Sequence, residues 1–525
     1  MTHNMSAIAT TMTAHEAIDK FISLNRFNRT HRKKNKRAFF EFQSHLIGFA
    51  AYAPYVHHLN SLGYKCYFGI LDNPISRLKT LKLKLQALFV IDKIEARPFY
   101  VFRSMKFARF LIVFERKRNS LEVSSFAAQY MGLSKTAILE MSFEEIHVGD
   151  LFYDWHLRKR GLATIDTSSN IFYEDLTEFI QFAMNWKRYL QKKKFEFVII
   201  THAVYLQGLI LRLSLMNGSE VFLVTPEKMF HLNLEMPLSD LESRKYRTDQ
   251  EIELSYHVDI QSAKLKLEKL MSGSRNVDIA HSHVNGMSGS ETNKVIHGGT
   301  SVNVMIATHC FSDSPHTNGS HLFPDFMEWL EWLARYSETT EYDWYIKAHP
   351  AFFPSDVVIL DEFCSRNPHI KFLSSAYSNR ELVSQGINVV LTVYGTIAFE
   401  MAYLGALVVN ASEFAPHSNY NFSLSPRSIT DYKKTLDNLE LLVKSFPIDR
   451  QEIIHFYDLH HLRRNYYWLF ETSFHEISNR FGVDYSRPLD IFLFYLNLME
   501  SQTYRDNIRA KINNFINSNS YTFVS

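Results

Sequence analysis

Short apolar runs alternate with longer segments of helical spacing through much of the chain. "AFFEF" (38–42) is followed by "IGFAAYAPYVHHLNSLG" (47–63) and then by "YKCYFGIL" (64–71). The two runs have the length of buried strands, and the segment between them ends at a glycine that suits a helix C-cap. This order predicts a strand–helix–strand unit of a parallel sheet. A second such unit spans 195–225, and "FARFLIVFE" (107–115) fits either a strand or a buried helix.

The pattern breaks over 272–300 and then restarts. The break is rich in Ser, Gly, Asn and His and has no apolar period, so we interpret it as a linker or mobile loop. After it, strands are predicted within 302–310, 342–350, 387–395 and 406–412, with helices within 323–338 and 396–405. Beyond about residue 430 the pattern is mostly helical.

A chain of 525 residues is too long for one core. We therefore expect an α/β protein with two Rossmann-like parallel-sheet domains facing a cleft and a helical C-terminal tail. The predicted segments are an N-terminal extension (1–36), an N-terminal α/β domain (37–271), the linker (272–300), a C-terminal α/β domain (301–430) and the tail (431–525).

Composition narrows the class of protein. A hydrophobic content of 46% with 21% charged residues is typical of a globular chain, and a net charge of +2 gives no reason to expect nucleic acid. Three cysteines, too few and scattered for a disulfide framework, fit a reducing cytoplasm. Neither a signal peptide nor an apolar run of roughly 20 residues is visible, so we expect a cytoplasmic protein.

One basic run, "RTHRKKNKR" (29–37), has two interpretations. It is either a solvated loop before the first strand or a contact with anionic lipid head groups at the inner face of the membrane.

Polar residues gather where three strands of the second domain end. They are His309, Asp313 and His316 after the first strand, Lys347 and His349 at the second, and Thr392, Tyr394, Gly395, Thr396 and Glu400 at the third. Because the carboxyl ends of parallel strands meet at one edge of a sheet, we expect these residues to line one crevice.

The second of these strand ends suits phosphate. Pro350 cannot donate to a sheet ladder and tends to end the strand. Lys347 and His349 are two residues apart and point to the same face of a strand, where two cationic donors can bind phosphate oxygens.

The third strand end predicts a turn into a helix. Gly395 permits the turn, and the helix start near Thr396 offers free N–H groups that favour an anion. Glu400, four residues on, lies on the same helix face, among apolar neighbours. A carboxylate in such surroundings needs a partner, and ribose hydroxyls would supply one.

The stretches "YIKAHP" (345–350), "VVLTVYGTIAFEMAYLGALVVN" (389–410) and "PHSNYNFSLSP" (416–426) resemble bacterial capsule polysaccharide glycosyltransferases of the GT-B fold. Similar families are the capsule Kdo transferases, the bacterial sialyltransferases that share the His-Pro motif and, more loosely, the teichoic-acid polymerases. The resemblance covers about 300–425.

The resemblance implies roles for several of these residues. His349 would lie at the phosphate of a CMP-sugar donor, with Thr396 or Thr392 in the Ser/Thr role of that family. The acceptor would be a glycan or a lipid-linked glycan. The acidic motif of the sialyltransferases is not recognisable, so the resemblance does not identify the catalytic base.

An inverting transfer needs a general base, which GT-B enzymes normally carry in the N-terminal domain. "IHVGDLFYDWHLRKRG" (146–161) offers Asp150 and Asp154, with Arg158 to hold an acidic acceptor. His202, at a predicted strand end, is a further candidate, and Asp313 is an outsider. No metal site is predicted, because neither a convincing DxD motif nor zincin spacing is present, and no cofactor is expected besides the donor.

The sequence thus favours an inverting glycosyltransferase that transfers Kdo or a related acidic sugar from a CMP donor to a bacterial surface polysaccharide. Three alternatives stay open: a UDP- or GDP-hexose transferase, a polyol-phosphate transferase of the teichoic-acid type, and a non-catalytic assembly scaffold.

Overall fold

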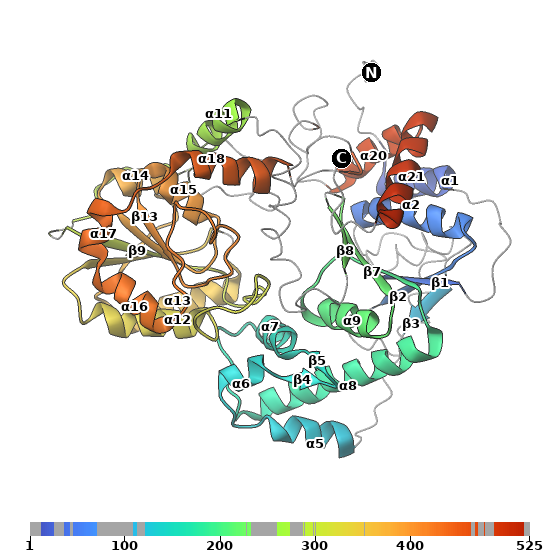
Figure 1. Cartoon of the computed structure of the whole chain (residues 1–525), viewed down its shortest axis with the longest axis horizontal. Coiled ribbons are helices and arrows are strands. Elements are labelled where there is room, and N and C mark those ends of the chain that lie inside the picture. Colours follow the sequence, from blue (N-terminus) through green and yellow to red (C-terminus); the bar gives the residue numbers. More distant parts are fainter. Residues whose placement is uncertain are drawn as a thin grey trace. The chain divides into compact units, whose positions relative to one another are not determined.

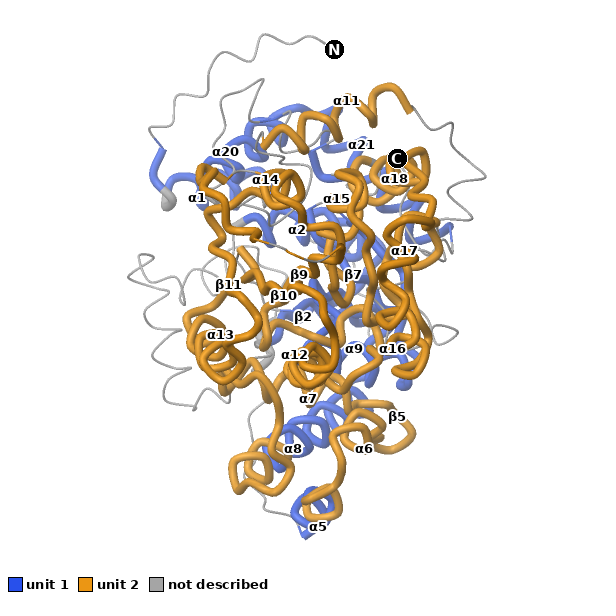
Figure 2. The backbone as a smooth tube through the Cα atoms, turned by 90° about the vertical axis from the view of Figure 1, so that its left-hand side faces the viewer, with its two compact units in different colours: residues 1–127, 177–236, 465–525 blue, residues 128–176, 237–464 orange. Residues whose placement is uncertain are grey.

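The computed structural model describes residues 12–25, 36–41, 46–70, 109–112, 121–226, 228–232, 260–273, 287, 289–297, 299, 301–350, 352–463, 468–470, 477 and 488–518. The chain forms two compact units, coloured separately in Figure 2. Unit 1 comprises residues 1–127, 177–236 and 465–525, and unit 2 comprises residues 128–176 and 237–464.

Unit 1 is built on a six-stranded sheet with the order β3-β2-β1-β6-β7-β8 (Figure 1). All neighbours are parallel except β7 and β8. The strands are β1 (Arg37–Glu41), β2 (Lys65–Ile70), β3 (Arg109–Ile112), β6 (Phe197–Ile200), β7 (Glu220–Val224) and β8 (Met229–Leu232). The strand order reverses between β1 and β6, which is where open α/β sheets bind ligands.

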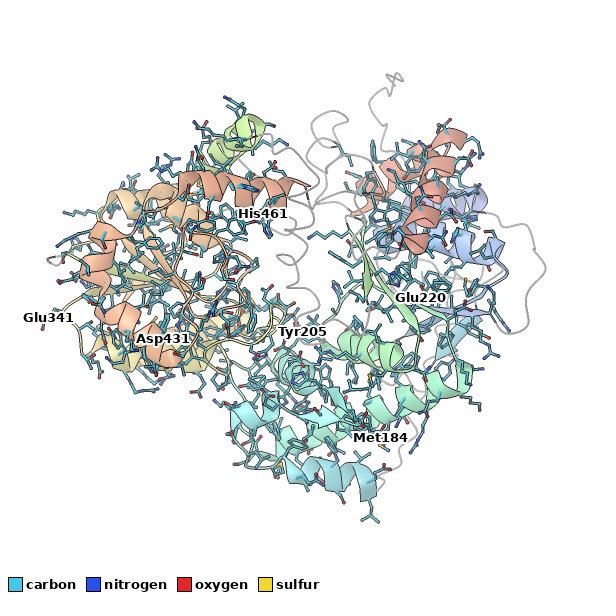
Figure 3. All side chains as sticks on the ribbon, in the orientation of Figure 1. Met184, Tyr205, Glu220, Glu341, Asp431 and His461 are labelled. Carbon is cyan, nitrogen blue, oxygen red and sulfur yellow. The ribbon has the colours of Figure 1, made fainter. Side chains whose placement is uncertain are left out.

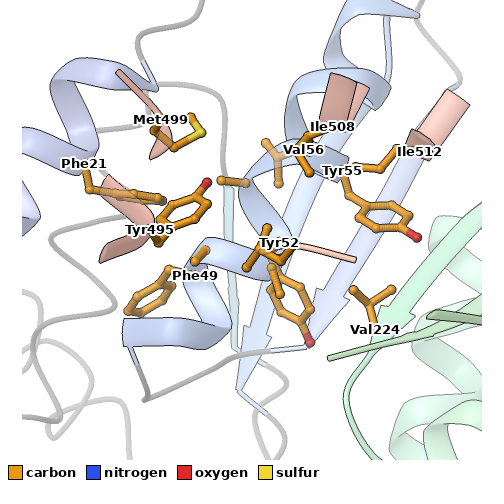
Figure 4. Packing of buried hydrophobic residues seen from close by; sticks show 14 of the residues in the cluster. Phe21, Phe49, Tyr52, Tyr55, Val56, Val224, Tyr495, Met499, Ile508 and Ile512 are labelled. Carbon is orange, nitrogen blue, oxygen red and sulfur yellow. The ribbon is translucent and has the colours of Figure 1, made fainter. Parts of the chain in front are cut away.

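Both faces of this sheet are covered, because successive strand residues point to opposite sides. Phe40 stacks on Phe68, with ring centroids 5.1 Å apart, in an apolar cluster shown in Figure 4. Phe39 faces the other way, toward Trp186, at 5.3 Å. The helices of the first face are α1 (Ala14–Leu24), α2 (Leu46–Ser61), α20 (Pro488–Leu498) and α21 (Gln502–Asn517); Trp186 lies on α8 (Asn170–Lys193).

Unit 2 contains a fully parallel sheet with the order β11-β10-β9-β12-β13. The strands are β9 (Asn303–Ala307), β10 (Asp343–Lys347), β11 (Lys371–Leu373), β12 (Val389–Thr392) and β13 (Leu407–Asn410). Here the order reverses between β9 and β12. The carboxyl ends of these two strands are therefore the expected ligand edge of unit 2.

Helices cover both faces of the second sheet as well. Trp344 and Ile346 belong to one apolar cluster and Tyr345, between them, to the other. The first face carries α12 (Phe326–Ser337), α13 (Pro354–Arg366), α16 (Ile429–Asp437) and α17 (Leu439–Ser445). The second carries α11 (Ile260–Met271), α14 (Asn379–Ser384), α15 (Ile397–Leu404) and α18 (Arg450–Tyr457), which is followed by the π-helical turn η2 (Asp458–Arg463).

The predicted α/β class, with two units built on Rossmann-like, mainly parallel sheets and with C-terminal helices, is confirmed. The helical tail does not stay together, however: α16, α17 and α18 belong to unit 2, whereas α20 and α21 belong to unit 1.

Residues 128–176 also differ from the sequence-based division, which placed them in the N-terminal domain. They form α6 (Lys135–Leu139), the hairpin β4 (Ser142–Phe143) and β5 (Ile146–His147), and α7 (Gly149–Arg160), all within unit 2. Tyr153 and Thr164 both donate hydrogen bonds to Asp325, the N-cap of α12, and Lys135 pairs with Glu328. These partners lie more than a hundred residues away along the chain, so the order of elements could not indicate them.

Part of the predicted linker is fixed to unit 2. The backbone N–H of Ser290 donates to the carbonyl of Ala376 (3.0 Å), and Gln385 accepts a bond from the N–H of Val295 (2.8 Å). Residues 274–286 of that segment, and residues 29–35 of the basic run, lie outside the described residues.

Candidate functional site

The carboxyl edge of the unit 2 sheet brings His309 and Thr392 together at the reversal of strand order. The Nε2 atom of His309 lies 3.0 Å from the Thr392 hydroxyl and accepts a bond from the N–H of Val393 (3.2 Å). Burial, with repulsion from His349, lowers the pKa of His309 to about 3, so the ring is neutral. Because Nε2 accepts, the ring proton is on Nδ1, which makes this atom a donor.

Gly395 lies close to the side chains of this turn. A Cβ atom there would lie 3.1 Å from the Thr392 hydroxyl and 3.2 Å from Cε1 of His309. The turn leads into α15, whose N-cap is the exposed Thr396 and whose first turn has no side-chain cap. The first N–H groups of α15 therefore have no side-chain acceptor and favour an anion.

Two aromatic rings pack against His309 and fix the position of its ring. The His309 ring packs against Phe326 and Tyr394, with centroid distances of 4.7 and 4.8 Å, and these two rings also contact each other at 5.8 Å. Tyr394 is thus placed at this edge as a packing partner of His309.

His349 follows β10 at the same edge and is half-buried. Its backbone N–H donates to the Thr308 hydroxyl (3.0 Å), and its Nδ1 lies 3.4 Å from the Cys310 sulfur. Burial lowers the pKa of His349, while Asp313 acts to raise it. Burial also raises the pKa of Cys310 to about 12, so the thiol stays protonated and can donate to Nδ1, which leaves the proton of His349 on Nε2.

Lys347 and Glu400 lie in a different environment from His349. Lys347 is 6% exposed and Glu400 is 8% exposed. Asn379, the first residue of α14, joins them: it accepts from the lysine Nζ (2.7 Å) and donates to Oε2 of Glu400 (3.3 Å). Sequence reasoning missed Asn379, because an asparagine at a helix start is ordinary and only the contact reveals its neighbours.

On α7, Asp150, Asp154 and Arg158 are spaced four residues apart and so share one helix face. The face meets the loop after β9, since Arg158 lies 3.8 Å from Asp313 and Asp154 pairs with His316. The sequence predicted these groups for the opposite domain, but the structure places α7 in unit 2.

His316 bonds both carboxylate oxygens of Asp154. The Asp154 carboxylate receives the His316 Nδ1 (2.5 Å) and its backbone N–H (3.1 Å), and His316 Nε2 donates to the carbonyl of Pro324 (2.8 Å). Burial alone would lower the pKa of His316, but Asp154 raises it above its ordinary value. With acceptors at both ring nitrogens, His316 is an imidazolium, and the pair is a buried ion pair rather than a dyad with a free base.

Asp150 stands in the first turn of α7 and not in a surface turn. A Cβ on the preceding Gly149 would lie 2.2 Å from the carbonyl oxygens of Ile138 and Leu139, so the glycine permits close packing of α7 on α6. The Asp150 carboxylate lies 3.2 Å from the Nδ1 of His147. As catalytic bases, Asp150 and Asp154 stay predictions.

His202 belongs to unit 1, where it is exposed after β6. Next to it, the buried Glu41 at the end of β1 accepts two bonds from Thr201, from the N–H and the hydroxyl, both 2.9 Å. The loop leads to α9 (Tyr205–Met216), whose first residue, Tyr205, is labelled in Figure 3 and has a positive φ of 54°. In the sequence Glu41 is part of a predicted strand, and no spacing indicates its contact with Thr201.

The described ranges contain no group of three or more His, Cys, Asp or Glu side chains suited to a metal ion. Within the same ranges, no helix is both long and apolar enough to cross a membrane.

No family model and no curated protein sequence matches this chain. Solved structures that resemble it include KpsC of Thermosulfurimonas dismutans, a β-Kdo 2,4 transferase, at 11% identity and a TM-score of 0.32 over 50% of this chain and 79% of that one. A UDP-GlcNAc 2-epimerase from Neisseria meningitidis, bound to UDP-GlcNAc, has 10% identity and a TM-score of 0.24 over 81% and 97%. The wall teichoic acid polymerase TagF has 8% identity and a TM-score of 0.21 over 92% and 94%. At such low scores no function is transferred from these proteins.

Proposed function

We propose that the chain is a glycosyltransferase that binds a nucleotide-activated sugar at the carboxyl edge of the unit 2 sheet. The observation that carries the proposal is the juxtaposition of an uncapped helix start with the buried carboxylate of Glu400, at the reversal of strand order. A nucleotide presents both an anion and a pair of ribose hydroxyls, and these are the groups that the two features would bind.

In this proposal the phosphate lies against the first N–H groups of α15 and the Thr396 hydroxyl. His309 supplies its Nδ1–H and His349 its Nε2–H as further donors. Both rings are neutral near pH 7, because burial lowers both pKa values. The contribution of the two histidines is therefore directional hydrogen bonding rather than charge.

The proposed donor is a CMP-linked acidic sugar, such as CMP-Kdo, and the proposed acceptor is a glycan or lipid-linked glycan of a bacterial surface polysaccharide. The support for this finer step is the resemblance of 345–350, 389–410 and 416–426 to the His-Pro family of transferases. The cytoplasmic location belongs to the same proposal.

Thermal denaturation of the full chain with CMP-Kdo, UDP-GlcNAc, a GDP-hexose and CDP-glycerol tests the donor class. A ligand present at 100 times its Kd should stabilise the protein by about 2.7 kcal/mol. Stabilisation by CDP-glycerol alone would favour polyol-phosphate transfer, and stabilisation by none would favour a scaffold.

His349→Ala tests the site itself. Loss of the phosphate donor should lower turnover at least tenfold, or about 1.4 kcal/mol, with folding intact. His369→Ala is the matched control, because His369 bonds Ser337 before the start of β11, at the other end of the sheet. Wild-type turnover in a folded His349→Ala protein would reject the phosphate role.

A further inference from the structure

The side chain of Lys347 is turned into the interior of unit 2. It shares a strand face with Tyr345, whose ring belongs to the apolar cluster beneath α14 and α15. An ammonium group that is 6% exposed must be paired or hydrogen-bonded. This environment differs from the open phosphate site that the sequence alone suggested for Lys347.

Two oxygens receive the Lys347 ammonium. It donates to the backbone carbonyl of Tyr377 (2.8 Å) and to Oδ1 of Asn379 (2.7 Å). Since Oδ1 faces a cation, the Nδ2 group of Asn379 faces the Glu400 carboxylate, at 3.3 Å from Oε2. A flipped amide would set NH₂ against NH₃⁺ and oxygen against oxygen, so the charges fix its orientation.

Glu400 keeps one oxygen available. Among the described residues, the hydrogen bond of Glu400 ends on Oε2 and none ends on Oε1. Oε1 is also absent from the fully buried polar atoms that have no partner, so solvent or a ligand can reach it. The residue as a whole is only 8% exposed. A nearly buried carboxylate with one open oxygen, in the first turn of α15, is suited to a ligand that brings hydroxyl donors.

We infer that Asn379 is a positioning residue for nucleotide binding in unit 2. It ties Glu400 to the Lys347 ammonium, and this keeps the carboxylate ionised and its free oxygen available for the vicinal hydroxyls of a ribose. The inference rests on the proposed function, because the ligand is the nucleotide of the donor.

The charges of Lys347 and Glu400 set a pH range for nucleotide binding. Burial raises the pKa of Glu400 to about 7, against the opposing effects of Asn379 and Lys347. Burial lowers the pKa of Lys347 to about 8, against the effect of Glu400. Below about pH 7 Glu400 gains a proton, and above about pH 8 Lys347 loses one. Nucleotide binding should therefore be strongest between these values.

Other ionisable groups on the elements packed against α15 are Arg380 and Glu381 of α14, Arg450, Glu452 and His455 of α18, and Asp458, His460 and His461 of η2. His461, labelled in Figure 3, lies 5.1 Å from the Phe399 ring. The pKa shift of Glu400 arises from burial, Asn379 and Lys347. Replacement of Asn379 or Lys347 should therefore move the pH dependence.

Calorimetric titration of the full chain with CMP between pH 6 and 9 tests the inference. Asn379→Leu should weaken CMP binding at pH 7.5 by about tenfold, the effect of one lost charge-assisted bond. In a plot of CMP affinity against pH, the acidic limb of this variant should also move to higher pH, because Glu400 loses the hydrogen bond that lowers its pKa. Asn379→Asp, which places a second carboxylate beside Glu400, should move that limb further, and Lys347→Met should remove the alkaline limb.

Asn303→Ser is the control for general destabilisation. Asn303 is also buried and donates to the carbonyl of Gly386 (3.1 Å), but it begins β9, at the amino edge of the same sheet. This variant should lower the thermal midpoint of unfolding and leave both limbs of the CMP profile unchanged.

The failures of the two proposals are distinguishable. If Glu400→Gln weakens CMP binding but the limbs stay fixed in folded Asn379→Leu and Lys347→Met proteins, Asn379 is only structural and the inference is overturned alone. If no nucleotide binds the wild type at any pH, or Glu400→Gln has no effect on binding, the proposed nucleotide site is itself rejected.

Discussion

At the carboxyl edge of the unit 1 sheet, β1 ends in Glu41 and Thr201 directly follows β6. At the carboxyl edge of the unit 2 sheet, β12 ends in Thr392 and His309 is the second residue after β9. Glu41 of unit 1 is 2% exposed and receives both bonds of Thr201 on one oxygen. Glu400 of unit 2 is also nearly buried, but it lies in the first turn of a helix whose start has no side-chain cap. Equal strand order thus gives two comparable edges, which differ in what lies beside the buried carboxylate: Thr201 in unit 1 and an uncapped helix start in unit 2.

The general base offers the strongest test of this difference, because each unit carries a candidate. Asp150→Asn keeps the shape and removes the basicity, so transfer should fall by about 10²–10⁴-fold while CMP binding is nearly unchanged. Single-turnover rates and calorimetry measure the two effects. If His202→Ala loses transfer and Asp150→Asn does not, the unit 1 edge carries the base. If both stay active, Asp154 and Asp313 are the next residues to replace.

The ion pair of Asp154 and His316 should give the largest loss of stability in unit 2. Asp154→Ala leaves a buried imidazolium without its partner, which should lower the free energy of unfolding by about 3–5 kcal/mol. Urea denaturation measures the loss. The double variant Asp154→Ala, His316→Leu removes the charge as well and should recover part of it. A single variant as stable as the wild type would show that the pair is exposed in solution.

Glu41→Leu is the corresponding test in unit 1. It leaves the N–H and hydroxyl of Thr201 without their acceptor, so the free energy of unfolding should fall by about 1–3 kcal/mol. Glu41→Gln retains an acceptor oxygen, so its free energy of unfolding should fall by less than that of Glu41→Leu. CMP affinity should stay at the wild-type value in both variants. Loss of CMP binding in a folded Glu41→Gln protein would contradict the assignment of the nucleotide to unit 2.

The smallest effects are expected for the basic run before β1, which unit 2 does not share. Binding to anionic liposomes should weaken by up to about 1 kcal/mol for each basic residue changed to Gln. Lys36 bonds the Tyr64 hydroxyl (3.2 Å) and Arg37 bonds the carbonyl of Lys193, so these two are already engaged. The triple variant in which residues 32–34 are changed to Gln should therefore weaken co-sedimentation with liposomes more than the double variant Lys36→Gln, Arg37→Gln. Equal binding by all variants would reject the lipid contact.

The elements of the fold were largely readable from the sequence. Apolar runs of strand length predicted the positions of β9, β10, β12 and β13, and 107–115 contains a strand, β3, rather than a helix. Local periodicity reports which face of a segment is buried, and this is enough for strands and helices. It does not report the partner, so the assignment of α7 to unit 2 and the division of the helical tail were not predictable.

In the candidate site, too, some positions were predictable from the sequence and others were not. His309, Thr392 and Gly395 follow from the rule that parallel strands end at one edge, and the structure brings them within contact. Lys347 was expected beside His349 from strand alternation alone. A long side chain, however, follows its hydrogen-bond acceptors, and those of Lys347 are Tyr377 and Asn379, which no spacing in the sequence connects to it.

Both early and late segments of the chain build the apolar cluster of unit 1. Phe21 of α1 lies 5.5 Å from the ring of Phe492 and 6.3 Å from that of Tyr495, both on α20, and all of unit 2 lies between them in the sequence. A ribosome therefore releases α1 and α2 long before α20 exists. Unit 2 can close during synthesis, whereas the first helices of unit 1 must wait for the final segment. The nascent chain can thus complete unit 2 before unit 1, and its early apolar helices are the surface that a chaperone would meet.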